Sequence, residues 1–194
     1  MATSNRLEGM TVAILAENRF EQSELLQPRE ALDAAGAKTV VVSPQPDEIQ
    51  GMNHDDPGQT VKVDLQLDRA NADDFDALLL PGGVVNPDRL RMNPKAMAFV
   101  RAFVQAGKPI AAICHGPWSL VEVDAVRGKR VTSWPSLQTD IRNAGGTWVD
   151  EVDVTDQNIT TSRKPDDIPQ FNQAMISLFE QSRTRGELRQ TAKV

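Results

Sequence analysis

The sequence predicts an α/β fold in which helices cover both faces of an open, mostly parallel sheet. Two observations predict it. Short apolar segments of strand length alternate with segments of helical periodicity along most of the chain, and such alternation is typical of parallel βαβ units. No internal repeat, low-complexity tract or interdomain linker interrupts the alternation. We therefore expect the 194 residues to form one domain.

The first half of the chain supplies the first of these elements. Residues 10–16 are an apolar run and predict a buried strand; residues 21–36 carry leucines and alanines at helical spacing and end on a glycine. Residues 38–43 are β-branched and predict a second strand. Residues 44–58 are rich in turn formers, and residues 60–67 alternate as a half-exposed strand or hairpin does.

The middle of the chain repeats the pattern. Residues 75–80 predict a buried strand that ends at a Pro-Gly-Gly turn, and residues 94–106 predict a helix that stops at a glycine. Residues 109–113 predict the next strand, which turns directly into a helix with Pro117 in its first turn.

The last elements are expected as a strand, a helix, a strand, a hairpin and a final helix, at residues 130–133, 135–144, 147–149, 152–161 and 167–179. The folded core then covers about residues 10–181. Residues 1–9 and 183–194 are polar, and we expect both ends to be flexible.

Composition narrows the partners and the compartment. Hydrophobic residues make up 40% of the chain and charged residues 25%, which excludes disorder as the main state. The net charge of −6 argues against nucleic acid or an anionic membrane surface as the main partner. A single cysteine, Cys114, excludes an intrachain disulfide and favours a reducing compartment. With no apolar run of signal-peptide or membrane-span type, we expect a cytoplasmic protein.

The strand order predicts where the site lies. We expect the flavodoxin-like order 2-1-3-4-5, a three-layer sandwich in which strands 1, 3 and 4 are central neighbours. Ligands bind such sheets beyond the carboxyl ends of the strands. Strand 1 leads to Glu21, strand 3 to Gly82 and Gly83, and strand 4 to Cys114. A carboxylate, bare backbone amides and the thiol are therefore expected in one crevice.

Cys114 lies in the segment Ala-Ile-Cys-His-Gly-Pro, a tight turn from strand to helix. Such nucleophile elbows hold their central residue in strained geometry and project its side chain outward. The helix N-terminus that follows favours the thiolate, and the amides of His115 and Gly83 could form an oxyanion hole. The alternative is that a lone cysteine after a strand is a buried hydrophobe.

The neighbouring titratable residues leave alternatives open. His115 could be the base of the thiol or could contribute only its backbone amide. Glu21 is one of three acidic residues near the end of strand 1, with Glu17 and Glu24, and could simply cap the helix. Held against a thiolate, its carboxyl would instead have a raised pKa and donate a hydrogen bond to sulfur.

Three further positions can be interpreted in two ways each. Asp88 could orient a histidine or be an ordinary acid at a helix N-terminus, and Trp134 could wall the pocket or belong to the core. His54, followed by two aspartates, hints at a metal site, but a solvated loop is the favoured interpretation and we expect no metal. No glycine-rich phosphate loop is present, so we expect no nucleotide or flavin cofactor.

These motifs, taken in order, resemble the PfpI-type family, which includes intracellular protease I, protein deglycases and general stress proteins. It belongs to the superfamily of the parkinsonism-associated deglycase and the class I glutamine amidotransferase domains. The resemblance covers roughly residues 10–181. The segments that carry it are Phe20–Leu25 (FEQSEL), Val61–Asp64 (VKVD), Phe75–Gly83 (FDALLLPGG), Gly107–Pro109 (GKP), Ile113–Pro117 (ICHGP), Asn143–Gly145 (NAG) and Thr161–Asp167 (TSRKPDD).

The resemblance implies a role for individual residues. Cys114 matches the nucleophile, which is also oxidation-sensitive, and Glu21 matches the carboxyl that hydrogen-bonds it. Gly83 and His115 match the oxyanion-hole amides, and His115 also matches the catalytic histidine. Asp88 matches the acidic residue that reaches that histidine from a neighbouring subunit in oligomeric members.

Two more residues belong to the expected pocket, Gly82 and Trp134, whereas Arg163 matches a motif arginine for which we expect a structural role. The resemblance also implies a homodimer or higher oligomer.

The family is described as cysteine peptidases, as glyoxalases or deglycases acting on methylglyoxal and its early protein adducts, and as redox-responsive stress proteins. For carbonyl chemistry, the Cys114 thiolate would add to an aldehyde while Glu21 or His115 moves protons. We expect a stress-protective hydrolase acting on small carbonyls or glycated protein. The alternatives are an intracellular peptidase and a non-enzymatic redox sensor or chaperone-like protein.

Overall fold

The computed structural model describes residues 5–191 and the side chains of residues 5–184. The strands of the main sheet are β1 Thr11–Leu15, β3 Lys38–Ser43, β6 Leu65–Gln66, β7 Ala77–Leu80, β8 Ile110–Ile113, β11 Asp153–Asp156 and β12 Ile159–Ser162. Within the described residues their order is β11-β12-β8-β7-β1-β3-β6, and every pair is parallel except β11 with β12. The central run β3-β1-β7-β8 is the predicted order 2-1-3-4, so the expected neighbourhood of strands 1, 3 and 4 is confirmed.

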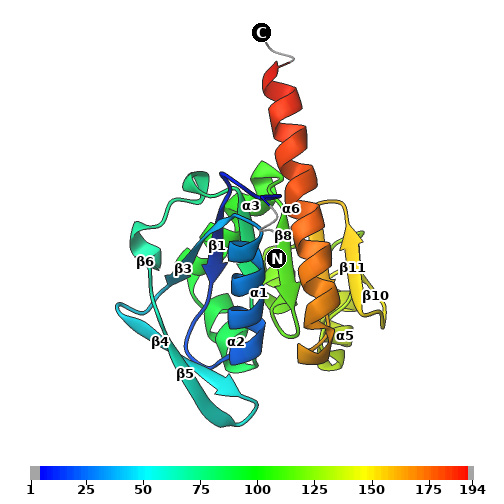
Figure 1. Ribbon diagram of the computed structural model, residues 1–194. Coiled ribbons are helices and arrows are strands. Elements are labelled where there is room, and N and C mark those ends of the chain that lie inside the picture. Colours follow the sequence, from blue (N-terminus) through cyan, green and yellow to red (C-terminus); the bar gives the residue numbers. More distant parts are fainter. Residues whose placement is uncertain (1–4, 192–194) are drawn as a thin grey trace.

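Helices cover both faces of this sheet. Figure 1 shows α1 and α6 packed in front of the strands, with α2 and α3 behind. The helices are α1 Gln22–Ala34, α2 Val85–Arg91, α3 Pro94–Ala106, α4 Pro117–Glu122, α5 Gln138–Asn143 and α6 Ile168–Thr191, joined by the short 3₁₀ helices η1 Leu67–Arg69, η2 Ala72–Asp74, η3 Pro135–Leu137 and η4 Pro165–Asp167. The predicted three-layer α/β architecture is therefore confirmed.

The alternation of side chains along β1 explains why the core has two parts. Val12 and Ile14 point to the α1 and α6 face, where Phe171 packs, whereas Ala13 and Leu15 point to the opposite face. Successive side chains of a strand point to opposite sides of the sheet. A central parallel strand therefore needs apolar residues at every position, which is the continuous run seen in the sequence.

The segment expected to be turn-rich contains a hairpin instead. β4 Glu48–Asn53 pairs antiparallel with β5 Asp56–Lys62, and the short β2 Phe20–Glu21 pairs parallel with β4. This hairpin projects from the body of the molecule (Figure 1), and most of β5 is exposed. An exposed strand tolerates polar residues, so the first part of β5 shows no apolar pattern. Residues 60–62 at its end belong to the segment 60–67 that was predicted as a half-exposed strand or hairpin.

Two other elements also differ from expectation. The short helix α2 follows the Pro-Gly-Gly turn where no helix was predicted. The strands predicted after α4 form a separate two-stranded sheet, β9 Arg130–Val131 with β10 Thr147–Trp148, so the hairpin strand β12 takes the place beside β8.

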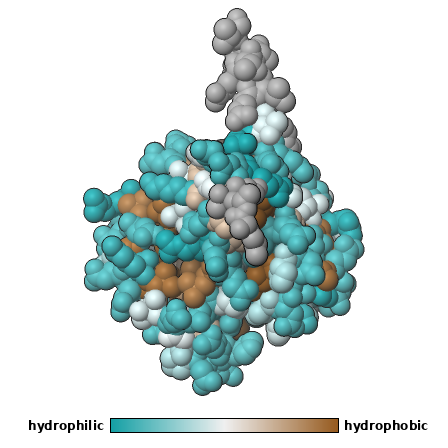
Figure 2. All heavy atoms as spheres, in the orientation of Figure 1, coloured by the Kyte–Doolittle hydropathy of each residue, from teal (hydrophilic) through white to brown (hydrophobic). Residues whose placement is uncertain are grey.

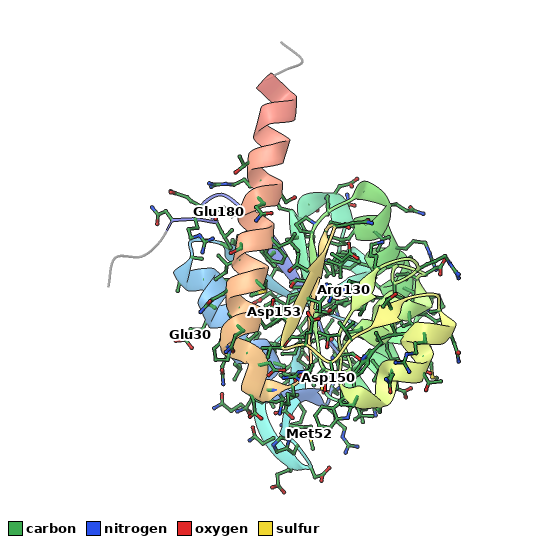
Figure 3. The ribbon with its side chains drawn as sticks, turned by 90° about the vertical axis from the view of Figure 1, so that its right-hand side faces the viewer. Glu30, Met52, Arg130, Asp150, Asp153 and Glu180 are labelled. Carbon is green, nitrogen blue, oxygen red and sulfur yellow. The ribbon has the colours of Figure 1, made fainter. Side chains whose placement is uncertain are left out.

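The described residues at the N-terminal end pack against the body of the molecule, and those at the C-terminal end continue helix α6. The flexibility expected of residues 1–9 and 183–194 stays a prediction. Leu7 is fully buried in the core, and its amide donates to the carbonyl of Ala35 at 2.9 Å. Arg6 donates to Glu180 on α6 at 2.6 Å (Figure 3). Helix α6 continues to Thr191 and extends beyond the body (Figure 1). Residues 1–4 and 192–194 lie outside the described part.

The visible surface is mostly hydrophilic. Figure 2 shows hydrophilic residues over most of the visible face, with hydrophobic residues in smaller patches. Among residues 5–191, no helix combines the length and the apolar character needed to cross a membrane.

The buried position of Leu7 gives a test of the N-terminal segment. Replacing Leu7 by Ala is expected to lower the free energy of unfolding by about 2–5 kcal/mol, because it removes a fully buried side chain from the core. Urea denaturation measures the change, with Glu8→Ala as the control at an exposed neighbour. Equal stability of the two variants would contradict a fixed N-terminal segment.

Candidate active site

A cavity of about 310 Å³ opens beyond the carboxyl ends of β1, β7 and β8. Its lining comes from the segments that follow these strands, from the tip of the β4–β5 hairpin, and from the loops before η3 and η4: Glu21, Glu24, His54, Asp55, Gly83, Val84, Cys114, His115, Trp134 and Pro165. The predicted convergence of Glu21, Gly83 and Cys114 in one crevice is confirmed.

Cys114 lies at the strained elbow between β8 and α4. Its φ angle is +60°, in the left-handed region that residues with a side chain seldom adopt. Hydrogen bonds on both sides enforce this geometry: its amide donates to the carbonyl of Ser162 at 3.0 Å, and its carbonyl accepts from the amide of Trp134 at 2.9 Å. Gly116 is required in the turn, because a Cβ there would lie 2.9 Å from the carbonyl oxygen of Ile113.

The carboxyl that faces the thiol is Glu24, and the assignment of this role to Glu21 is wrong. Glu24 is fully buried beside Cys114, and its charge raises the pKa of the thiol. Its Oε2 accepts the amide of Gly82 at 3.0 Å. Glu21 lies one turn earlier at the cap of α1, where its Oε2 accepts the amide of His54 at 3.0 Å. Glu21 lines the mouth of the cavity and Glu24 its floor.

Helical periodicity is the feature that could have identified Glu24. The buried residues of α1 are Glu24, Leu25, Pro28 and Leu32, which share one face of the helix. A carboxylate on the apolar face is unusual, because burying an unpaired charge is costly. Its place on that face is a stronger indication of function than the helix-capping position of Glu21.

Gly82 allows the Glu24 carboxyl and the Cys114 thiol to approach each other. A Cβ on Gly82 would lie 2.7 Å from the Cβ of Cys114 and would also collide with the Glu24 carboxyl. Gly82 therefore lies behind the site and is not one of the residues that line the cavity. Gly83 has a φ of +75° and does line it.

Burial controls the protonation of the site. It raises the pKa of Glu24 to about 8, with the charge of Glu21 as the second cause. Burial also raises the pKa of the Cys114 thiol, and the charge of Glu24 adds to this effect. The amides of Gly83 and His115 hydrogen-bond the sulfur and act in the opposite direction, but they do not outweigh burial. Burial therefore works against the expected resting thiolate.

His115 is placed to take the proton of the thiol. Its Nδ1 lies 3.1 Å from the Sγ of Cys114. Burial lowers the pKa of His115 to about 4, so the imidazole is neutral at pH 7 and one ring nitrogen can accept a proton. The ring packs against Trp118 and stacks on Trp134, with centroid distances of 5.2 and 5.9 Å. Trp134 therefore lines the pocket, which was one of the two interpretations of this residue.

Ser136 is a neighbour of the site that the sequence did not reveal. Its Oγ lies 3.3 Å from the Nε2 of His115. Serine is common in turns, and nothing in the sequence singled it out. The residue reaches the histidine because the backbone bond between Trp134 and Cys114 brings η3 against the elbow.

The remaining predicted residues lie around the site or apart from it. Asp88 is on the exposed side of α2 and does not line the cavity described here. Arg163 pairs with Asp150 and Asp167 at 2.7 and 2.8 Å, which is a structural role. His54 and Asp55 at the hairpin tip line the cavity mouth. Among the residues described, no cluster of three or more His, Cys, Asp or Glu side chains could hold a metal.

The fold and site define a class: an α/β protein with a buried cysteine at a nucleophile elbow, between a protonated carboxyl and a neutral histidine. The family model described as the DJ-1/PfpI family matches residues 10–178. The chain belongs to this family.

Individual relatives agree with the match. The chain is 39% identical over 171 residues to the deglycase PH1704 of Pyrococcus horikoshii, covering 88% of this chain and all of that protein. It is 38% identical over 170 residues to the putative cysteine protease YraA of Bacillus subtilis, covering 87% of this chain and 98% of that one. Among solved structures, a two-domain protein of Anabaena variabilis, with a DJ-1/ThiJ/PfpI-like and a ferritin-like domain, superposes with a TM-score of 0.81 at 37% identity, over 87% of this chain and 47% of that chain.

The charge of Glu24 gives a test of the site that needs no substrate. Because that charge raises the pKa of the Cys114 thiol, Glu24→Gln is expected to increase the rate of alkylation by iodoacetamide at pH 8.5 by about tenfold, which corresponds to one pKa unit. The chain has one cysteine, so intact mass reports the site directly. Glu21→Gln is the matched control and is expected to change the rate little. Faster alkylation in the Glu21 variant alone would indicate that Glu21, and not Glu24, is the carboxyl that faces the thiol.

The raised pKa of Glu24 also predicts a pH dependence of stability. Between about pH 4.5 and 8 the carboxyl is protonated in the folded state and ionised in the unfolded state. The unfolded state then binds fewer protons, so rising pH costs the wild-type protein stability, by up to about 1.4 kcal/mol per pH unit. Glu24→Gln lacks this loss, and its stability relative to wild type is expected to rise with pH across that window. A pH-independent difference in urea denaturation would show that Glu24 is already ionised in the folded protein.

Proposed function

We propose that the protein is a cysteine-dependent, stress-protective hydrolase that acts on methylglyoxal or its early protein adducts, with the side chain of Cys114 as nucleophile. The observation that carries the proposal is the Cys114 thiol held between a protonated carboxyl and a neutral imidazole inside a small cavity. The similarity to a relative named as a deglycase supports the same chemistry.

The first step follows from the positions of three groups. The sulfur of Cys114 adds to the aldehyde carbon, and the thiol proton passes to Nδ1 of His115, 3.1 Å away. The electron pair of the C=O bond moves to oxygen, which the amides of His115 and Gly83 can stabilise, since both already point at the sulfur. Protonation of that oxygen gives a hemithioacetal.

The later steps need a group that both donates and accepts protons near neutral pH. Glu24, with a pKa raised to about 8, meets this requirement. Moving hydrogen from the former aldehyde carbon to the adjacent carbonyl carbon isomerises the hemithioacetal to a thioester of lactate. Water then hydrolyses the thioester, which releases lactate and restores the thiol. In total, methylglyoxal and water give lactate.

The size of the cavity favours a small carbonyl compound over a polypeptide. About 310 Å³ is at the lower end of the range for small-molecule sites. The similarity to a relative named as a putative cysteine protease is the support for peptidase activity. A sensor based on oxidation requires an accessible thiolate, whereas Cys114 is 6% exposed and its thiol pKa is raised by burial.

Self-association is part of the proposal. Helix α2 carries Val84 and Met92 at its two ends, and these side chains are 55% and 78% exposed. Large apolar side chains on either side of the exposed Asp88 suit a contact between copies of the chain. We place the protein in the cytoplasm on its single cysteine.

Lactate release from methylglyoxal in thiol-free buffer tests the function. The freshly reduced wild-type protein is expected to form lactate, and Cys114→Ala to lose at least about a thousandfold in rate while its circular dichroism stays unchanged, because the nucleophile is lost. Lactate from the alanine variant at the wild-type rate would remove Cys114 from the mechanism. No lactate from the wild type would contradict the carbonyl chemistry itself.

A further inference from the structure

His115 has a polar neighbour at each ring nitrogen. Nδ1 lies 3.1 Å from the Sγ of Cys114, and Nε2 lies 3.3 Å from the Oγ of Ser136. A neutral imidazole carries a single proton, so one nitrogen donates and the other accepts. Only the tautomer with the proton on Nε2 leaves Nδ1 free to take the thiol proton. The groups around the ring determine which tautomer forms.

We propose that Ser136 is a positioning residue that holds His115 in the Nε2–H tautomer, so that Nδ1 faces the thiol as a proton acceptor. The hydroxyl oxygen accepts the hydrogen bond from Nε2–H. The contacts from Cys114 through His115 to Ser136 all lie within one chain.

The hydrogen bonds at the sulfur favour the same tautomer. The sulfur already accepts the amides of Gly83 and His115. The thiol hydrogen needs an acceptor, and Nδ1 provides one. A proton on Nδ1 would instead add another donor at the sulfur and leave the thiol hydrogen without this acceptor.

The position of Ser136 suits an acceptor. The residue is exposed, so its own O–H can donate to solvent while its lone pairs face the ring. Its place is fixed by two backbone bonds of the η3 turn: the amide of Trp134 donates to Cys114 at 2.9 Å, and the amide of Leu137 donates to Trp134 at 3.1 Å. The turn and the elbow therefore hold Ser136 and His115 in fixed positions relative to each other.

The aromatic neighbours have a separate role. Trp134 stacks on the His115 ring at an interplanar angle of 25°, and Trp118 packs at 60° with its indole fixed by Asp140 at 2.8 Å. These contacts hold the plane of the ring. Both tautomers have the same shape, so stacking discriminates little between them and the hydrogen bond at Nε2 supplies the preference.

The chain is well suited to a direct measurement of the tautomer. It contains two histidines, so the ¹⁵N spectrum of the imidazoles contains two sets of signals, and His54→Gln assigns them. At pH 7 we expect the wild-type His115 to show a protonated Nε2 and an unprotonated Nδ1. Ser136→Ala is expected to shift the ratio of tautomers toward Nδ1–H by about three- to tenfold, the effect of one lost hydrogen bond. Ser136→Thr, which keeps the hydroxyl, is expected to retain the wild-type spectrum.

Kinetics give a second readout, which rests on the proposed function. Ser136→Ala is expected to lower kcat for methylglyoxal by about three- to tenfold with KM unchanged, and Ser136→Thr to recover most of it. If the wild-type protein forms no lactate but Ser136→Ala still shifts the tautomer ratio of His115, the proposed function is overturned and the role of Ser136 stands.

Asp88→Asn separates this inference from a contact made across a subunit interface. If an acid of a neighbouring copy sets the tautomer, the Asp88 variant changes the His115 spectrum and Ser136→Ala does not. That result, or a wild-type spectrum in Ser136→Ala, would overturn the assignment of Ser136. A change in the Ser136→Ala spectrum that Ser136→Thr reverses would support it.

Discussion

The contact between the Glu24 carboxyl and the Cys114 thiol is the constraint on which the rest of the site depends. Both groups are buried, and the carboxyl is tied to the amide of Gly82 at 3.0 Å. Three segments must meet for this contact to form: the first turn of α1, the glycine turn after β7 and the elbow after β8. They meet because β1, β7 and β8 are adjacent parallel strands whose carboxyl ends share one edge of the sheet.

Burial in this contact raises the pKa of both its members. It keeps Glu24 protonated near neutral pH. It also holds the proton on the Cys114 thiol, so nucleophilic attack requires a base beside the sulfur. Neutral His115 provides that base, and its pKa is lowered by the same burial. One physical cause therefore sets the resting protonation of all three groups.

The fold tolerates local strain at the site because the surrounding backbone is fixed. Cys114 keeps a φ of +60° since its amide and carbonyl are bonded to Ser162 and Trp134 on either side. The second of these bonds also brings η3 to the elbow, with Trp134 over the histidine ring and Ser136 at its outer nitrogen. The strained turn and the environment of the histidine are thus parts of one arrangement.

The sequence by itself determined the layers of the fold, the order of the central strands and the elbow at Cys114. These follow from periodicity, from glycines at turns and from the rule that places ligands at the carboxyl ends of strands, all of which are local or topological. It predicted a half-exposed strand or hairpin at residues 60–67, which overlaps β5, but it did not identify β4, whose residues lie in a segment rich in turn formers. The choice between Glu21 and Glu24 depends on which face of α1 turns toward the sheet; helical periodicity indicates that face, and the tertiary structure decided it. Likewise, only the packing of η3 against the elbow placed Ser136 beside His115, and only burial, which arises when the elements pack together, decided that the thiol keeps its proton.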